Sequence, residues 1–433
     1  MSTLARIQTH RAATISVAIL STAFALAGAP VHAQQRGGNQ PPPPDTLNDP
    51  VRIMVARLDL EKYKATVKGL TQFGDRRQGT ERNRKAVDWI EAQLKSYGCT
   101  PTERIKYTYT TPPPRDSAGG RGRGRGGAPG DSAAGGRGGR GRGNTAQGGG
   151  RFRGIRTQTG VNTDSLKQPD PRIRALDAEP ATDGPREEVF CTKVGSTRPG
   201  EMYIVGGHMD GHGWNEAAND DGSGTALVME LARVFSSPDV KTDRSIRFVL
   251  WNNEETGTNG ARAYIAQRDS LQGKENPPGS GKYPEPNWLG MIQHDMMMFD
   301  HGMPRPDGTM SPEQRPEADV NIEFQATSKQ AEGAQKLAWF FQTANEKYAT
   351  DYPARVGQHM TNTDSGPFQD LVPAISLREN ERGEQIGAGW DPQWHQPTDL
   401  FSTYNDKDFR LGLNAAQTTL AAVALLTGAT LVK

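Results

Sequence analysis

Apolar residues recur along the chain with two periods, and each period predicts a different kind of element. Near the N-terminal end, a helix opened by Pro50 is expected over 51–73, and a second helix is expected over 81–97, where Gly98 ends it. Residues 105–109 then alternate between apolar and polar side chains, which is typical of a strand.

After residue 185, short apolar runs alternate with longer amphipathic segments. Strands that alternate with helices in this way predict an α/β fold, a single three-layer α/β/α domain with a central, largely parallel sheet. The expected strands cover 189–194, 202–208, 246–251, 289–295, 320–326 and 374–377, and the expected helices cover 222–235, 259–267, 330–348 and 406–426.

Residues 112–160 show neither period. Runs such as RGRGRGG and GGRGGRGRG have no apolar side chains to bury, so this stretch is expected to be disordered. We extend this Gly/Arg-rich insertion, mostly disordered, to residue 184, so that it divides the folded domain into 51–111 and 185–433. Residues 112–170 carry 11 basic and 4 acidic side chains, whereas the whole chain has a net charge of only +1, so the rest of the chain is mildly acidic.

Arg-Gly repeats resemble segments that bind RNA, because arginine contacts phosphate and stacks on bases. RNA or polyanion binding is therefore an alternative function of another class. We favour a solvated insertion in a surface loop and expect no nucleic-acid partner, because no aromatic platform accompanies the repeats and the chain begins like an exported protein.

The N-terminus has the pattern of an export signal. Two arginines precede an apolar run over 12–29, and small residues at the cleavage positions predict a cut after Ala33. A membrane anchor is the alternative, but the run is shorter than the ~20 apolar residues that a span needs. We expect a signal peptide over 1–33, a Pro/Gln-rich linker over 34–50, and a periplasmic or extracellular mature chain without a membrane span.

The chain has two cysteines, Cys99 and Cys191, and each lies at the edge of a predicted strand. An exported protein permits a disulfide between them. Two small buried thiols are an equally good interpretation of the same positions.

Polar clusters follow the predicted strands and precede two of the predicted helices. In open α/β sheets the ligand site lies at the carboxyl ends of the strands, so we interpret these clusters together. They are GGHMD at 206–210, NDDGSG at 219–224, NNEE at 252–255, QHDM at 293–296 and WHQPTD at 394–399.

The first two clusters each have two interpretations. His208 and Asp210 face the same way on a strand, which suits a metal ligand and the carboxylate that orients it, or a buried hydrogen-bonded pair. The adjacent Asp220 and Asp221 can reach a cation, or one of them can cap the following helix.

The other clusters are equally open when each is taken alone. Glu254 and Glu255 repel each other unless metal charge makes one a ligand and the other a general base; an exposed acidic loop is the alternative. His294 and His395 compete as ligand candidates, and their residue type does not choose between them.

The five clusters, in this order, resemble those of the co-catalytic zinc exopeptidases of clan MH, typified by bacterial leucyl aminopeptidases and glutamate carboxypeptidases. The resemblance covers about residues 51–111 and 185–430. It implies a mixed, largely parallel eight-stranded sheet, two Zn²⁺ per chain, and a metallopeptidase that hydrolyses peptide bonds at the ends of peptide substrates.

The resemblance also implies a ligand set, carried over residue by residue. Two histidines and three carboxylates would hold the zinc ions, and one carboxylate would be shared between them. The ligands would be His208 and Asp295 for the first ion, Glu255 and His395 for the second, and Asp220 for both. This set leaves His294 out.

Two further side chains receive catalytic roles from the resemblance. Glu254 would be the general base that takes a proton from the attacking water and delivers it to the leaving amine. Asp210 would be the carboxylate behind His208. The family often has a cis peptide between the residues that match Asp220 and Asp221.

The stretch 363–368 resembles the loop that lines the substrate pocket in that family, and we expect Asp364, Phe368 and Arg378 to bind substrate. An aminopeptidase must recognise a free amine, whereas a carboxypeptidase needs a cation for the terminal carboxylate. Arg378 and Arg382 are candidates for that cation. We favour an aminopeptidase, since that activity is widespread among exported bacterial relatives.

The chain departs from the family pattern beside the pocket. Many relatives use a Tyr or His there to stabilise the oxyanion, but Trp394 stands where one branch carries the Tyr, and His359 is the alternative candidate. Glutaminyl cyclases share the fold with one zinc and a changed ligand set, and the intact His208 argues against that activity.

Overall fold

The computed structural model describes 48–112, 160–300, 320–360, 362–379 and 391–432, all within one compact unit. The predicted signal peptide, almost all of the predicted linker and the Arg-Gly repeats lie outside the described residues, and so does Arg382.

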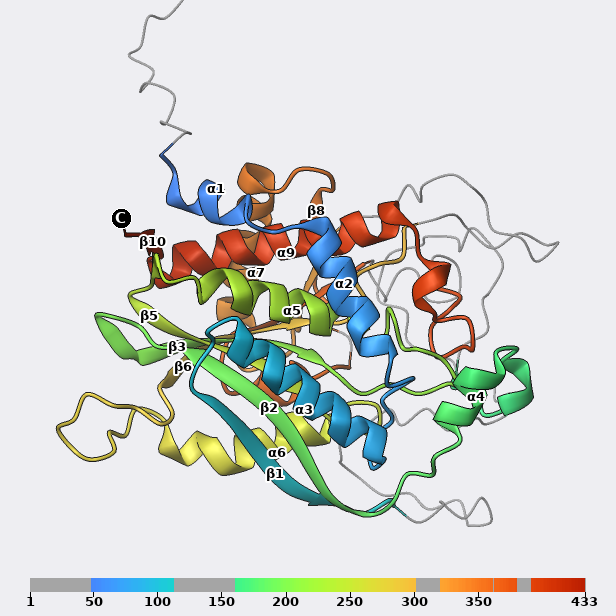
Figure 1. Ribbon diagram of the computed structural model, residues 1–433. Coiled ribbons are helices and arrows are strands. Elements are labelled where there is room, and N and C mark those ends of the chain that lie inside the picture. The colour runs from blue at the N-terminus through green and yellow to red at the C-terminus, as the bar shows by residue number, and fades with distance from the viewer. Residues whose placement is uncertain (1–47, 113–159, 301–319, 361, 380–390, 433) are drawn as a thin grey trace, which may run out of the picture. The chain divides into compact units, whose positions relative to one another are not determined.

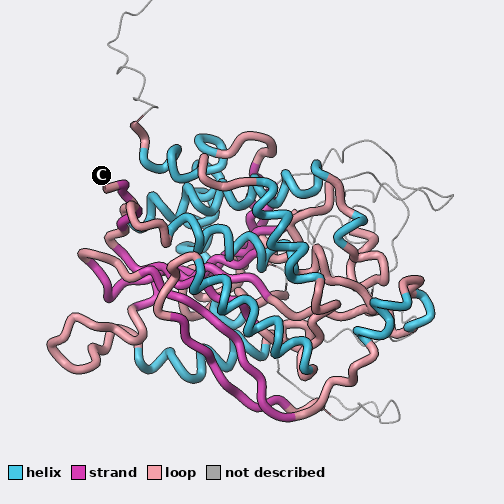
Figure 2. Tube along the Cα trace, viewed as in Figure 1, coloured by secondary structure: helices cyan, strands magenta, loops and turns pink. Residues whose placement is uncertain are grey.

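An eight-stranded mixed sheet forms the centre of the fold, as predicted (Figures 1 and 2). Its four middle strands β5, β3, β6 and β9 run parallel, while β1, β2 and the β7–β8 pair lie antiparallel to their neighbours. In spatial order the strands are β1 (Thr102–Tyr109), β2 (Gly184–Lys193), β5 (Arg244–Trp251), β3 (Arg198–His208), β6 (Asn287–His294), β9 (Ala374–Arg378), β7 (Val320–Phe324) and β8 (Ala354–Gly357).

Helices cover both faces of the sheet, and Figure 1 shows α5 and α9 on one side and α6 on the other. The helices are α1 (Pro50–Val55), α2 (Leu60–Thr71), α3 (Glu81–Ser96), α4 (Pro171–Asp177), α5 (Gly222–Phe235), α6 (Asn259–Arg268), α7 (Ala331–Tyr348) and α9 (Asp406–Thr427). A separate two-stranded sheet pairs β4 (Val240–Lys241) with β10 (Thr430–Leu431).

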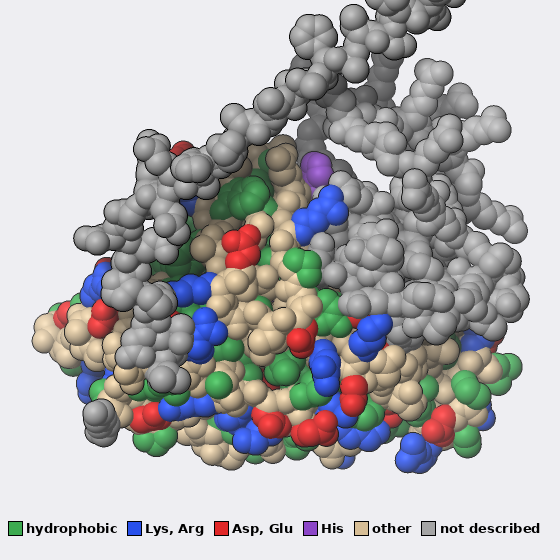
Figure 3. Space-filling model, turned by 90° about the horizontal axis from the view of Figure 1, so that it is seen from above, with side chains coloured by type: hydrophobic (Ala, Val, Ile, Leu, Met, Phe, Trp, Pro, Cys, Tyr) green, Lys and Arg blue, Asp and Glu red, His purple; other side chains and the backbone are tan. Residues whose placement is uncertain are grey.

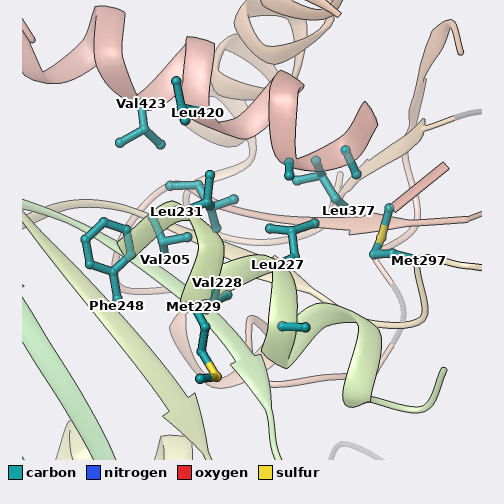
Figure 4. Close-up of a cluster of buried hydrophobic side chains, with 14 of the residues drawn as sticks. Val205, Leu227, Val228, Met229, Leu231, Phe248, Met297, Leu377, Leu420 and Val423 are labelled. Carbon is teal, nitrogen blue, oxygen red and sulfur yellow. The ribbon is translucent and has the colours of Figure 1, made fainter. Parts of the chain in front are cut away.

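The period of two in the strands divides the apolar side chains between two cores. On β3, Val205 belongs to the core beneath α5 and α9, whereas Ile204 belongs to the core beneath α6. On one side, Leu231 of α5 lies below Leu420 of α9 over the sheet, and Leu227 of α5 belongs to the same core (Figure 4). Both faces are therefore buried, which explains the nearly continuous apolar runs of the parallel strands.

The helix α9 closes the fold and is the longest of the described helices. Among the described residues it alone is long and apolar enough to cross a membrane, and 72% of its apolar window is buried inside the fold. That burial is typical of the core helix of a soluble domain.

One of the predicted helices is wrong. The single helix expected over 51–73 is two helices, α1 and α2, because Asp59 caps a new helix: its side chain accepts a hydrogen bond from the N–H of Lys62. Of the insertion expected over 112–184, the structure describes residues 112 and 160–184, and the second of these parts carries α4, whose Ile173 is 6% exposed.

Cys99 and Cys191 form a disulfide, with 5.7 Å between their Cα atoms. The bond joins the end of α3 to β2, and both residues are buried. The alternative of two free thiols is therefore wrong.

Candidate metal and catalytic site

The carboxyl ends of three adjacent parallel strands bring the predicted site together. His208 is the last residue of β3, Asp295 follows β6 directly, and Glu254 and Glu255 lie in the loop after β5. Register explains the convergence: Gly207 of β3 pairs with both Leu250 of β5 and His294 of β6, so the three strands stop at the same level.

The first group of ligand candidates surrounds His208. Its Nε2 lies 3.4 Å from Asp220 Oδ1 and 3.8 Å from Asp295 Oδ1. All three side chains are at least 95% buried. Ligand atoms of a tetrahedral zinc ion, each about 2.0–2.2 Å from the metal, lie roughly 3.4 Å from one another, so these spacings suit a shared cation.

The second group surrounds His395, whose Nε2 lies 2.9 Å from Asp220 Oδ2 and 3.1 Å from Glu255 Oε2. Asp220 therefore presents one oxygen to each histidine, as a carboxylate shared by two ions would. The structure brings together all five predicted ligands, and His294 lies elsewhere: its Nδ1 is 3.1 Å from Gly206 O and its Nε2 is 2.8 Å from Thr419 Oγ1.

The site holds many buried carboxylates, whose negative charge would be neutralised by cations. Burial raises the pKa of Glu254 well above its usual range; the charge of His208 opposes this rise, and the charges of Asp364 and Glu255 add to it. Burial opposes a charged His395 ring, but Glu255 and Asp220 outweigh this and raise its pKa to about 10. Among the described residues, Glu255 Oε1 and His395 Nδ1 make no hydrogen bond. Buried carboxylates in such number are stabilised by metal ions, so the residues fit zinc.

Asp221 holds the strand ends and the helix start in place. Its carboxylate accepts hydrogen bonds from the backbone N–H of His208, Gly224 and Met296, at 3.0, 2.8 and 3.2 Å. The Asp220–Asp221 peptide is cis, as the resemblance implies. A Cβ on Gly207 would meet the backbone of Gly224 at 2.8 Å, so glycine allows α5 to approach β3 this closely.

Asp210 is close to His208, but through a different atom from the one predicted. The Nδ1 of His208 lies 2.9 Å from the backbone oxygen of Asp210 and 3.9 Å from its carboxylate. That carboxylate instead accepts the backbone N–H groups of Glu254 at 3.0 Å and Glu255 at 3.4 Å. Asp210 therefore fixes the loop that carries both glutamates.

The three predicted substrate residues are not placed as a pocket lining. Phe368 is fully buried and packs between Trp251 and Trp288, with ring centroids 5.8 and 5.5 Å away. Arg378 is 2% exposed and donates from Nη2 to Asp295 Oδ2 at 2.7 Å, so it stands behind a ligand candidate and is not free for a substrate carboxylate.

Asp364 is also fully buried and belongs to the acidic centre. Its Oδ2 accepts a bond from Gln293 Nε2 at 3.4 Å, and burial raises its pKa well above the usual range. His359 is exposed, and Trp394 stacks on His395 with ring centroids 4.2 Å apart.

Sequence reasoning missed His212. Its Nε2 lies 3.0 Å from Glu255 Oε2, and its ring meets His395 edge-on with centroids 4.1 Å apart. His212, Glu255 and His395 can together hold one ion, since one ligand atom from each lies within 4.8 Å of the others. The only signal in the sequence was its spacing, two residues after Asp210 in GGHMDGHG.

Residues 160–168, also missed, connect the two loops that carry these histidines. Asn162 donates from its backbone to His395 O at 3.0 Å and from its side chain to Gly213 O at 3.2 Å. Gln168, fully buried, donates to Trp214 O and to Pro397 O, both at 2.8 Å. We call residues 160–168 the strap.

A family model and several known proteins match parts of this chain. A family model described as "Peptidase family M28" matches residues 189–419. Aminopeptidase YwaD of Bacillus subtilis is 39% identical over 75 residues, and carboxypeptidase Q of Xenopus laevis is 37% identical over 71 residues; these matches cover 17% and 16% of this chain and 15% of each relative.

Solved structures match over much more of the chain. An aminopeptidase from Aneurinibacillus sp. strain AM-1 has 18% identity and a TM-score of 0.53, with 86% of this chain and 95% of that chain covered. Glutaminyl cyclase of Porphyromonas gingivalis has 15% identity and a TM-score of 0.50, with 85% and 99% covered. These likenesses confirm the predicted fold.

Proposed function

The chain belongs to peptidase family M28, and from that premise we propose that it is an exported zinc exopeptidase that removes residues from the free amino end of peptides. The predicted family is thus confirmed, and it supports a metallopeptidase. The observation that carries the rest is the placement of Asp220 between two histidines, with one carboxylate oxygen 3.4 Å from His208 and the other 2.9 Å from His395.

Two zinc ions would be held by the predicted ligands. His208 and Asp295 would bind the first, Glu255 and His395 the second, and Asp220 both. When bound, zinc lowers the pKa of a coordinated water and polarises the scissile carbonyl group. Glu255 Oε1, which makes no hydrogen bond among the described residues, supports this assignment.

Glu254 would move the proton. The Asp210 carboxylate accepts the backbone N–H of Glu254 and so holds the loop that carries this carboxylate. As water adds to the carbonyl carbon, Glu254 accepts the water proton, and it then delivers that proton to the amine nitrogen as the C–N bond breaks.

The acidic centre favours an amino terminus over a carboxyl terminus. Arg378, the cation closest to the candidate ligands among the described residues, is paired with Asp295 and is not free for a terminal carboxylate, which supports a substrate bound by its amino end. Of the two curated relatives described above, one is named an aminopeptidase and the other a carboxypeptidase, so the choice rests on this charge pattern.

Export is part of the proposal. The apolar N-terminal run supports it, and so does the Cys99–Cys191 disulfide, since such bonds persist in oxidising compartments. The Arg-Gly repeats lie outside the described residues, and RNA binding by them remains a prediction that we do not favour. On the face seen in Figure 3, the visible acidic and basic side chains are interspersed, which offers a polyanion no broad basic surface there.

Metal analysis and substrate choice test the function together. We expect about two zinc ions per chain, and chelator-sensitive hydrolysis of amino-acid anilides but not of N-blocked peptides with a free carboxyl end. Cleavage of the blocked peptides alone would make the chain a carboxypeptidase. Absence of zinc after reconstitution would overturn the site assignment.

A further inference from the structure

His212 is the histidine at this site that the family ligand set does not use. Its side chain is 17% exposed, and its Nε2 points into the second group of ligand candidates, 3.0 Å from Glu255 Oε2. The Nε2 of His395 lies 3.1 Å from the same oxygen. Two imidazole nitrogens therefore approach one carboxylate oxygen from two elements.

The contact between His212 and Glu255 has the distance of a hydrogen bond without its alignment, because His212 Nε2 makes no hydrogen bond among the described residues. Ligands of one ion have this relation: their lone pairs converge on the metal and not on each other. The perpendicular rings of His212 and His395, 4.1 Å apart at their centroids, leave both Nε2 atoms facing Glu255.

The loop that carries His212 is built to hold this position. Asn215 donates to His212 O at 3.1 Å and to Gln396 O at 2.8 Å, which joins the loop to the segment of His395. A Cβ on Gly213, which has a φ of +118°, would meet His395 O at 2.6 Å, so glycine is required for this approach. The strap hydrogen-bonds to the same two loops through Asn162 and Gln168.

We propose that His212 is a third imidazole ligand of the zinc pair and binds the second ion together with Glu255, His395 and Asp220. This inference rests on the proposed function. Four protein ligands satisfy the tetrahedral preference of zinc and make a closed site, whereas three ligands leave a position open. The second ion would then be held more firmly, and the first ion, held by His208, Asp220 and Asp295, would have a position open.

A role as a hydrogen-bond donor that orients Glu255 is the alternative, and ligand counting separates the two. X-ray absorption at the zinc edge of the doubly loaded wild-type chain should report three imidazole rings per two zincs. The His212→Ala chain should report two rings at most and bind its weaker zinc at least about tenfold less tightly. Two rings in a wild-type chain that binds two zincs would overturn the inference alone; a wild-type chain without zinc would overturn the proposed function with it.

Two further variants keep the test specific. His212→Gln retains a side-chain N–H donor but no imidazole, so an orienting role predicts wild-type zinc affinity and a ligand role predicts the affinity of His212→Ala. His359→Ala removes an exposed histidine elsewhere and should keep three rings and both affinities. Wild-type zinc affinity of His212→Gln would count against the inference, whether or not the alanine variant folds.

Discussion

The two halves of the site are built from different parts of the fold. The half around His208 rests on strand ends: His208 ends β3, Asp295 follows β6, and Arg378 ends β9 and donates to Asp295. The half around His395 rests on loops, with His395 itself at a φ of +58° and held through its backbone oxygen by Asn162.

This difference separates two ways of positioning a ligand. Strands tied into a central sheet hold side chains with little freedom, so the first half needs only Arg378 as a counter-charge behind it. Loops need external contacts, and the second half obtains them from the strap and from Asn215. A left-handed backbone at His395 costs on the order of 1–3 kcal/mol, and these contacts maintain it. We therefore expect the two halves to fail in different ways.

The largest expected effect comes from Glu254, which belongs to neither half of the site. Glu254→Gln removes the proton acceptor and keeps the shape of the side chain, so kcat should fall by about 10²–10⁴-fold. Both zinc ions should remain, because Glu254 is not in either ligand group. Steady-state kinetics and metal analysis on the same sample check this. An inactive variant that has also lost zinc would show that Glu254 supports a metal and not a proton transfer.

Arg378→Met should damage the first half. Removing one partner of a buried ion pair leaves an uncompensated charge on Asp295, and the metal-free chain should lose about 3–5 kcal/mol of unfolding free energy. The zinc beside His208 should bind more weakly. When the variant holds only one zinc per chain, that ion should be coordinated by the imidazoles of the second half. Denaturant unfolding and X-ray absorption measure the two effects.

The control for Arg378→Met is Arg84→Met, which breaks an exposed pair with Glu81. An exposed pair contributes at most about 1 kcal/mol, and zinc binding should not change. Equal losses in the two variants would mean that burial of Arg378 has no special importance for the first half.

Gln168→Ala should damage the second half. The change removes two hydrogen bonds from buried carbonyl groups of the loops, at a cost of about 1–3 kcal/mol in unfolding free energy. Zinc beside His395 should dissociate faster, while the ion beside His208 should not. Stopped-flow release to a chelator resolves the two ions, and Gln72→Ala on the exposed end of α2 is the matched control. Faster release of both ions would show that the strap supports the whole site.

The sequence predicts the first half better than the second, because the first half is positioned by strand ends and the second by loops. The strand ends follow from the ends of the short apolar runs, and α5 has the predicted bounds because Asp221 caps it. Parallel strands then bring His208, Glu254 and Asp295 together without further information. These positions depend mostly on local patterns.

The second half depends on contacts between distant segments, which no local pattern reveals. His212 lies in a glycine-rich loop, and it becomes a ligand candidate only when that loop meets residues 395–397. The strap follows a Gly/Arg-rich stretch that lacks any period, and its role depends on single hydrogen bonds from Asn162 and Gln168. Arg378 has the residue type of a substrate ligand, and only its burial against Asp295 shows otherwise.

The smallest expected effect comes from a charge network outside both halves. It tests whether a loss of unfolding free energy is by itself enough to weaken zinc binding. Glu91 of α3 accepts bonds from Thr102 and Arg104 of β1 and lies 2.7 Å from Lys95 Nζ. Burial raises its pKa, but Lys95, Arg104 and Thr102 outweigh burial and lower it to about 2.

Because this pKa is lowered in the folded chain, the stabilisation is present above the ordinary value of about 4.5 and is lost as the pH falls towards 2. Glu91→Gln should therefore lower the unfolding free energy by no more than about 1 kcal/mol at pH 6, with a difference that shrinks below pH 4. Urea unfolding at pH 6 and again below pH 4 measures this difference in unfolding free energy. The control is Glu332→Gln, which breaks an exposed pair on α7. Zinc affinity should stay at the wild-type value, since Glu91 touches neither half. If zinc loosens in Glu91→Gln as much as in Gln168→Ala, then general stability, and not the strap, governs the second half of the site.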